Sequence, residues 1–275
     1  MLFRVSILIL GLIQLTLAQS TQSTGAGKTN KADQNRYLRI LPLGNMHLPD
    51  EKLINGIREL QPPKPGEAPP STLAPQGEIA QEKPLKITID SPSRFAAFGP
   101  EVKEVKLFDA KEAGQLWFQF PTPALQRSLA VLYRDHQKLD WRHMKSLILK
   151  DDALAFPLGA ARFVNVSDRS LLLQFTFRKK GKSLTSEKGR LKPGQSYLRR
   201  LSAGGEKVKI MIINSGENLL LREEMLKPDQ KQRIQYFFYK NSLKKAPKPV
   251  RVVTFPEKIP PLPLLNLTAR AKKAE

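Results

Sequence analysis

Residues 156–201 constrain the fold more than any other stretch, because they consist of short strand-like segments separated by polar turns. From Leu171 to Phe177, apolar residues occupy every second position, which is typical of a strand with one face on a core. Arg178 to Lys182 is expected to be a charged hairpin loop. Pro193 and Gly194 stand at the two central positions of a type II turn. These residues predict an antiparallel sheet.

Short apolar segments recur along the rest of the chain, and almost none shows helical periodicity. Strands are predicted at 85–90, 105–108, 116–120, 129–134, 145–150, 153–156, 162–166, 171–177, 197–201, 208–213, 218–222, 233–239 and 250–255. This spacing predicts an all-β protein, with an antiparallel, immunoglobulin-like β-sandwich over residues 85–257.

The N-terminal part is expected to serve export and linkage. Residues 1–18 have the basic start, apolar core and small-residue end of a secretory signal peptide; an uncleaved membrane anchor is the alternative. Residues 19–60 are expected to be a flexible leader, with a short strand at 36–43 and a short helix at 49–60. Residues 61–84 hold seven prolines in 24 positions and predict a linker. A disordered basic tail is expected over 258–275.

Composition restricts the compartment and the chemistry. The chain has no cysteine, so disulfides and thiolate chemistry are excluded. Together with the signal peptide, this favours an exported bacterial protein, periplasmic or extracellular. The formal net charge is +21, and residues 162–209 hold 13 Lys and Arg against three carboxylates, a net of +10. Such asymmetry raises the chance of a polyanionic partner.

The positive charge is concentrated around the predicted turns at 178–200. If these side chains share one face, they form a site for phosphate, sulfate or carboxylate groups. The predicted polyanion-binding residues are Arg178, Lys179, Lys180, Lys182, Lys188, Arg190, Lys192, Arg199 and Arg200. A merely solvated, basic surface is the alternative. Nearby aromatic residues alternate into the expected core, so stacking on nucleic-acid bases is not indicated.

Two similar segments suggest a short internal repeat. Leu191–Gln195 (LKPGQ) and Leu226–Gln230 (LKPDQ) lie 35 residues apart, and each follows an Asn-containing turn and a Leu-rich strand. The repeats would centre on 156–201 and 208–240. The alternative is that a sandwich reuses the same turn chemistry at regular spacing.

Motifs for catalysis, cofactors or metals are not found in the sequence. G-x-S-x-G, Walker A and H-E-x-x-H are absent. His136 and His143 lie near Asp135 and Asp140, but the spacing does not suit a metal site and a third ligand is not evident. We therefore expect neither a catalytic site nor a cofactor, small-molecule or metallic.

One group of short motifs carries a resemblance to a known class of proteins. Ala155-Phe156-Pro157-x-Gly159, Arg162-Phe163-x-Asn165-x-Ser167 and Leu191-x-Pro193-Gly194 resemble segments of uncharacterised exported bacterial β-sandwich proteins with an immunoglobulin-like fold. The resemblance covers about 50 residues. It implies the fold and implies neither an activity nor any site residue.

Three functions remain open from the sequence. The first is a non-catalytic envelope protein, a binding or assembly module whose basic face meets an anionic envelope polymer or lipid head groups. The second is a periplasmic chaperone-like or subunit-like protein that pairs with another protein through a sheet edge, with the strand at 233–239 as the candidate edge. The third is a hydrolase with a site built from separate loops. A membrane span after signal cleavage is not expected.

Overall fold

A computed structural model describes residues 35–45, 50–61, 63–79, 84–112, 114–138, 140–178, 184–215, 217–243 and 246–261. Within this part the chain is nearly all β, and it contains no α-helix. The strands are β1 (Arg36–Leu43), β2 (Glu51–Ile54), β3 (Ile57–Leu60), β4 (Thr72–Pro75), β5 (Leu85–Lys86), β6 (Ala96–Phe98), β7 (Glu104–Asp109), β8 (Leu116–Pro121), β9 (Arg127–Arg134), β10 (Met144–Lys150), β11 (Ala160–Asn165), β12 (Leu171–Arg178), β13 (Leu184–Leu191), β14 (Gln195–Arg200), β15 (Glu206–Ile212), β16 (Leu219–Leu226), β17 (Arg233–Lys240) and β18 (Val250–Glu257).

Sixteen of these strands form four sheets of four strands each. We name them sheet I (β10-β9-β1-β6), sheet II (β5-β4-β7-β8), sheet III (β14-β11-β17-β18) and sheet IV (β13-β12-β15-β16). Neighbouring strands are antiparallel except for β1 with β9 and β11 with β17, which are parallel. The remaining two strands, β2 and β3, form a separate hairpin.

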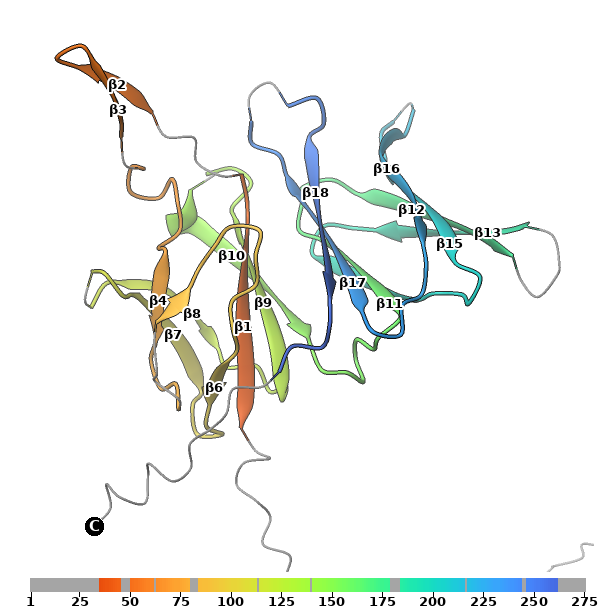
Figure 1. Cartoon of the computed structure of the whole chain (residues 1–275), viewed down its shortest axis with the longest axis horizontal. Coiled ribbons are helices and arrows are strands. Elements are labelled where there is room, and N and C mark those ends of the chain that lie inside the picture. Colours follow the sequence, from red (N-terminus) through yellow and green to blue (C-terminus); the bar gives the residue numbers. More distant parts are fainter. Residues whose placement is uncertain are drawn as a thin grey trace, which may run out of the picture. The chain divides into compact units, whose positions relative to one another are not determined.

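The four sheets stack face to face in the order II, I, III, IV (Figure 1). Sheets II and I enclose one apolar cluster that includes Ile40 and Leu107. Sheets III and IV enclose another that includes Phe163 and Leu173. A third cluster lies between sheets I and III, so these two central sheets are buried on both faces. This explains why neighbouring residues of β11, such as Phe163 and Val164, are both fully buried.

The two sheet pairs repeat one topology. In chain order, β1 and β4 to β10 correspond to β11 to β18, and this matching converts sheet I into sheet III and sheet II into sheet IV. The parallel pair occurs at the corresponding place in each half. We call β1 with β4–β10 the N-terminal half and β11–β18 the C-terminal half. The β2–β3 hairpin is an addition to the N-terminal half, between β1 and β4.

A local irregularity supports this correspondence. The β7–β8 register shifts between Leu107 and Phe108, and the β15–β16 register shifts between Ile210 and Met211. The residues left over by the shifts are Trp117 and Leu221, and each packs on the core of its own half. A β-bulge thus lies at the same position in both halves.

The structure corrects the repeat suggested by the two LKP turns. Each of these turns leads from sheet IV to sheet III, β13 to β14 and β16 to β17, but the strands beside them occupy different places in the sheets. The LKPGQ turn is of the expected kind, because Gly194 has φ 76° and the Gln195 N–H donates to the Lys192 carbonyl. The LKPDQ turn differs, because Asp229 has no positive φ and its carbonyl accepts from the Gln232 N–H, so the two segments are similar in sequence only.

The helix predicted over 49–60 is wrong. Its apolar spacing fits a helix, but Asn55 and Gly56 have φ of 50° and 81°, as a type I′ turn requires, and the segment folds into the β2–β3 hairpin. Part of the predicted linker is also a strand: β4 pairs with β7, and Leu73 is fully buried. Residues 153–156 form a turn and not a strand, with the Ala155 N–H donating to the Asp152 carboxylate.

The strand predicted at 36–43 is confirmed as β1, but it lies in the middle of sheet I and belongs to the core. The signal peptide, the leader up to residue 34 and the tail from residue 262 lie outside the described residues. Helices long and apolar enough to cross a membrane are absent from the described part of the chain.

Candidate functional site: the outer face of sheet IV

Strand alternation divides sheet IV into an apolar inner face and a mixed outer face. Leu171, Leu173 and Phe175 point into the core, as the sequence predicts, so Leu172, Gln174 and Thr176 point outward. The register then assigns the outward rows. They are Arg190–Leu172–Met211–Leu220, Lys188–Gln174–Lys209–Glu223, Ser186–Thr176–Lys207–Met225 and, at the end, Leu184–Arg178.

This outer face is strongly cationic. Its five basic residues are Arg178, Lys188, Arg190, Lys207 and Lys209, and its one carboxylate among the described residues is Glu223. The difference is +4. Glu223 pairs with Lys207 and, at 3.3 Å, with Lys209; the hydrogen bond from Lys207 lowers the pKa of Glu223 below its usual value. Arg178, Lys188 and Arg190 are exposed, and each lacks an acidic partner within the described part of the chain.

The structure brings together only some of the predicted polyanion-binding residues. Arg178, Lys188 and Arg190 share the outer face, and Lys192 follows in the exposed turn after β13. Lys179, Lys180 and Lys182 lie outside the described residues.

Arg199 and Arg200 do not belong to this face, because β14 is a strand of sheet III. The Arg199 guanidinium donates to Glu206 at 2.8 Å and to Glu187 at 2.6 Å, and it lies over the Phe175 ring. These bonds outweigh the effect of burial and raise the pKa of Arg199 further above its usual value. Arg199 is thus committed to internal bonds.

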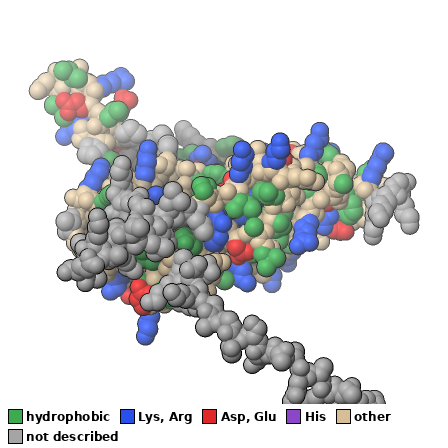
Figure 2. All heavy atoms as spheres, turned by 60° about the horizontal axis from the view of Figure 1, so that its bottom comes forward, with side chains coloured by type: hydrophobic (Ala, Val, Ile, Leu, Met, Phe, Trp, Pro, Cys, Tyr) green, Lys and Arg blue, Asp and Glu red, His purple; other side chains and the backbone are tan. Residues whose placement is uncertain are grey.

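Lys207 and Lys209 were missed in the sequence-based selection. The signal was present, since the two lysines alternate with Val208 and Ile210 and must therefore point away from the core. What the sequence could not show is that β15 lies next to β12, which places these lysines between β13 and β16. Figure 2 shows one face of the molecule, on which Lys and Arg side chains outnumber the acidic ones.

A second group of charges is buried at the junction of the two halves. Arg39 of β1 donates to both oxygens of Asp151, at 2.6 and 3.1 Å, and to both oxygens of Glu257, at 2.7 and 2.8 Å. Arg233 donates to Asp151 at 2.8 Å and lies 3.1 Å from Glu257. Arg162 donates to Gln235 at 2.6 Å and to Asp151 at 3.4 Å. We call these residues the junction cluster.

The junction cluster follows the internal repeat. Arg39 lies two residues before Leu41, and Arg162 lies two residues before Val164; Leu41 and Val164 both belong to the apolar cluster between sheets I and III. By strand position Arg39 therefore corresponds to Arg162. Arg127 corresponds to Arg233, at the start of β9 and β17. Asp151 lies opposite Arg127, since its N–H donates to the Arg127 carbonyl, and Glu257 lies opposite Arg233 in the register of β17 and β18.

Aromatic rings cover the arginines of the junction cluster. Phe156 lies 4.2 Å from the Arg162 guanidinium and 4.5 Å from that of Arg233. Phe95 takes the same role at 4.9 Å for Arg127 and 5.6 Å for Arg39. Rings over guanidinium groups contribute to holding these charges away from water.

The pKa shifts of the cluster express this burial. Burial lowers the pKa of Arg162 to about 10. Burial also acts against Arg39, but its hydrogen bonds to Glu257 and the charge of Asp151 outweigh it and raise the pKa of Arg39. For Glu257 burial acts upward, yet the bond from Arg39 and the charges of Arg39 and Arg233 lower its pKa. Arg39, Arg162 and Glu257 therefore stay ionised at neutral pH, which suits a role in joining the halves.

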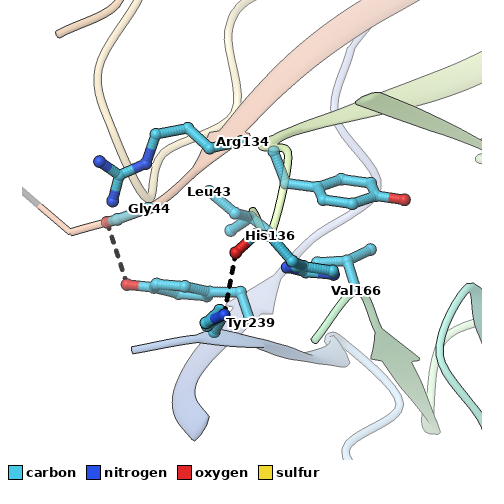
Figure 3. A pocket seen from close by; sticks show the side chains of 8 residues that line it. Leu43, Gly44, Arg134, His136, Val166 and Tyr239 are labelled. Carbon is cyan, nitrogen blue, oxygen red and sulfur yellow. Dashed lines mark hydrogen bonds between the residues drawn. The ribbon is translucent and has the colours of Figure 1, made fainter. Parts of the chain in front are cut away.

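A small depression lies elsewhere between the same two sheets (Figure 3). Tyr239 donates to the Gly44 carbonyl at 3.1 Å, and Lys240 donates to the His136 carbonyl at 2.9 Å. These bonds use the Tyr239 hydroxyl and the Lys240 ammonium, two of the polar groups that line the space. Burial lowers the pKa of His136, so this imidazole is neutral at pH 7.

The described residues hold no group of three or more His, Asp and Glu side chains placed to bind a metal ion. His143 lies 3.8 Å from Asp140, while the His136 ring packs at a tilt beside the Tyr133 ring. Both therefore have ordinary protein neighbours.

The edge-strand prediction for 233–239 is wrong. β17 pairs with β11 on one side and with β18 on the other, so its backbone hydrogen bonds are already used. Its aromatic residues Tyr236, Phe237 and Phe238 are buried because sheet III is covered on both faces. The aromatic content that suggested a free edge instead marks the centre of the protein.

Comparison with known proteins adds little. No protein-family model and no curated protein matches the chain. Among solved structures, it is similar to one titled the sugar binding protein pneumolysin (12% identity, TM-score 0.27, 62% of this chain), to one titled "Trapped Toxin" (8%, 0.25, 60%) and to the human-specific toxin intermedilysin (8%, 0.21, 62%). The aligned part spans 31% of each of those chains. TM-scores this low carry no argument.

Proposed function

We propose that this protein is a non-catalytic, exported bacterial envelope protein that binds polyanions through the outer face of sheet IV. The observation that supports the proposal best is the set of five cations on that face against one carboxylate. Arg178, Lys188 and Arg190 are exposed and offer guanidinium and ammonium donors to phosphate, sulfate or carboxylate groups. Export rests on the signal-like residues 1–18.

The proposal includes the finer fold assignment, in which both sheet pairs are immunoglobulin-like sandwiches. Two packed four-stranded sheets of largely antiparallel strands support it. It includes no catalytic activity. In support, each carboxylate that is buried among the described residues, Glu78, Asp151 and Glu206, pairs with an arginine.

Salt-dependent binding tests the proposal. The variant R178Q/K188Q/R190Q removes the three exposed, unpaired cations and leaves the Lys207–Glu223–Lys209 pairing intact. Heparin serves as the probe, and the slope of log affinity against log salt is measured. Each lost contact should reduce the slope by about 0.7 to 0.9, hence by about 2 to 3 for the triple variant.

A matched control removes the same charge elsewhere. Lys86, Lys103 and Lys111 are exposed residues of the N-terminal half. The variant K86Q/K103Q/K111Q has the same net charge as the test variant. Equal slopes for the two variants would show that only total charge matters, and the proposed face would be abandoned.

A further inference from the structure

The outer face of sheet IV is apolar as well as cationic. Leu172, Met211 and Leu220 stand next to one another across three strands, in the row that Arg190 completes. Leu184 and Met225 lie on the edge strands β13 and β16, and their exposed fractions are 65% and 56%; that of Leu220 is 43%. Large apolar side chains thus surround the lysines and arginines.

We infer that the partner of this face is the surface of an anionic lipid bilayer; the inference rests on the proposed function and narrows it to one partner. A hydrophilic polymer contacts cations but gains nothing from exposed Leu and Met. A bilayer interface binds both the cationic and the apolar side chains, because lipid phosphates attract Lys and Arg while Leu and Met are buried at the boundary of the acyl chains.

The internal repeat shows that the fold does not require this combination. The outer face of sheet II occupies the corresponding position in the N-terminal half. There Lys106 corresponds to Lys209, but Glu104 takes the place of Lys207 and lies 3.7 Å from Lys106. Leu116, at the position of Leu220, is 44% exposed, so an exposed apolar residue occurs in both halves, and the concentration of cations is what distinguishes sheet IV.

The shape of the site fits a surface rather than a pocket. The contributing residues come from four adjacent strands of one sheet, and the small depression of Figure 3 is lined by other residues. Leu184 and Met225, at the two edges, stand on either side of the central lysines Lys207 and Lys209. Such a face can lie on a bilayer with cations at the phosphates.

Vesicle co-sedimentation tests the inference, using the chain from Gln19, because residues 1–18 would themselves partition into lipid. Vesicles of phosphatidylcholine alone are compared with vesicles in which roughly one lipid in three is phosphatidylglycerol, whose anionic head group attracts Lys and Arg. The variant L184S/M225S keeps every charge. We expect at least about tenfold weaker binding to the anionic vesicles, since burying one such side chain is worth that much, and unchanged elution from heparin.

Two controls separate the outcomes. L154S/L243S replaces two apolar residues that are also exposed, at 89% and 46%, but lie outside sheet IV, and it should bind like the unchanged protein. Circular dichroism confirms that each variant is folded. Heparin binding without vesicle binding, or vesicle binding that L184S/M225S leaves unchanged, would overturn the lipid inference while the polyanion-binding function stands. If the unchanged protein binds neither heparin nor anionic vesicles, the proposed polyanion-binding function itself is overturned.

Discussion

At the residue scale, the junction cluster depends on Arg39. Its guanidinium is 3% exposed and makes four hydrogen bonds to two carboxylates, one at the end of each half. Removing one partner of a buried ion pair is far more costly than removing an exposed pair, because the remaining charge stays buried without compensation. The stability of the fold should therefore fall in acid. Because the pKa of Glu257 is lower in the folded than in the unfolded chain, its carboxylate stabilises the fold at pH values above its ordinary pKa of about 4.5. This stabilisation is lost as the pH falls through the lower, folded-state pKa.

Arg39→Met keeps the side-chain length and removes the charge. We expect the free energy of unfolding to fall by about 3 to 5 kcal/mol, since Asp151 and Glu257 lose one of the two arginines that they share. Urea unfolding at pH 7 measures the change. Arg58→Met is the control, because Arg58 and its partner Glu51 are 80% and 56% exposed and should contribute little. Similar midpoints for the two variants would contradict the role assigned to Arg39.

At the element scale, the β2–β3 hairpin stands apart from the repeat. Its residues are mostly exposed, including Leu53, Ile57 and Leu60 at 68%, 65% and 67%. The C-terminal half lacks a corresponding hairpin between β11 and β12, where residues 166–170 suffice. The core of a half therefore forms without such an addition.

Replacing residues 51–60 by Gly-Gly should leave the fold intact. Asp50 and Gln61 are already joined, since the Gln61 N–H donates to the Asp50 carbonyl at 2.7 Å, so a short turn can close the gap. We expect the melting temperature to change by less than about 2 °C. A loss of about 1 kcal/mol would change the melting temperature of a domain of this size by more than that. Thermal melting by circular dichroism measures it. A fall of several degrees would mean that the hairpin contributes to the core.

At the scale of the whole molecule, sheets I and III pack face to face and share one apolar cluster. Leu41, Val131, Val164 and Phe237 come from both halves and are at most 1% exposed, all in the cluster between these sheets. Neither half could expose this face to water without a large loss of hydrophobic stabilisation. We therefore expect the halves to unfold together.

Phe237→Ala tests whether the two halves unfold together, with tryptophan fluorescence as the signal from the N-terminal half. The chain has two tryptophans, Trp117 and Trp141, and both belong to the N-terminal part. Deleting the Phe237 ring from β17 should cost about 3 to 5 kcal/mol and shift the tryptophan fluorescence transition as much as the circular dichroism transition. A tryptophan transition that does not move would show that the halves are independent.

Local patterns in the sequence determined the β content, the inward face of residues 171–177 and the type II turn at Pro193-Gly194, because alternation and turn chemistry act over a few residues. The tertiary structure alone decided which strands are neighbours. It buried the aromatic strand β17, turned Arg199 inward, placed Lys207 and Lys209 on the same outer face as Lys188, and assembled the junction cluster from residues up to 218 apart. Pairing between distant strands and the burial of charge depend on which faces meet, and short-range patterns carry no information about that.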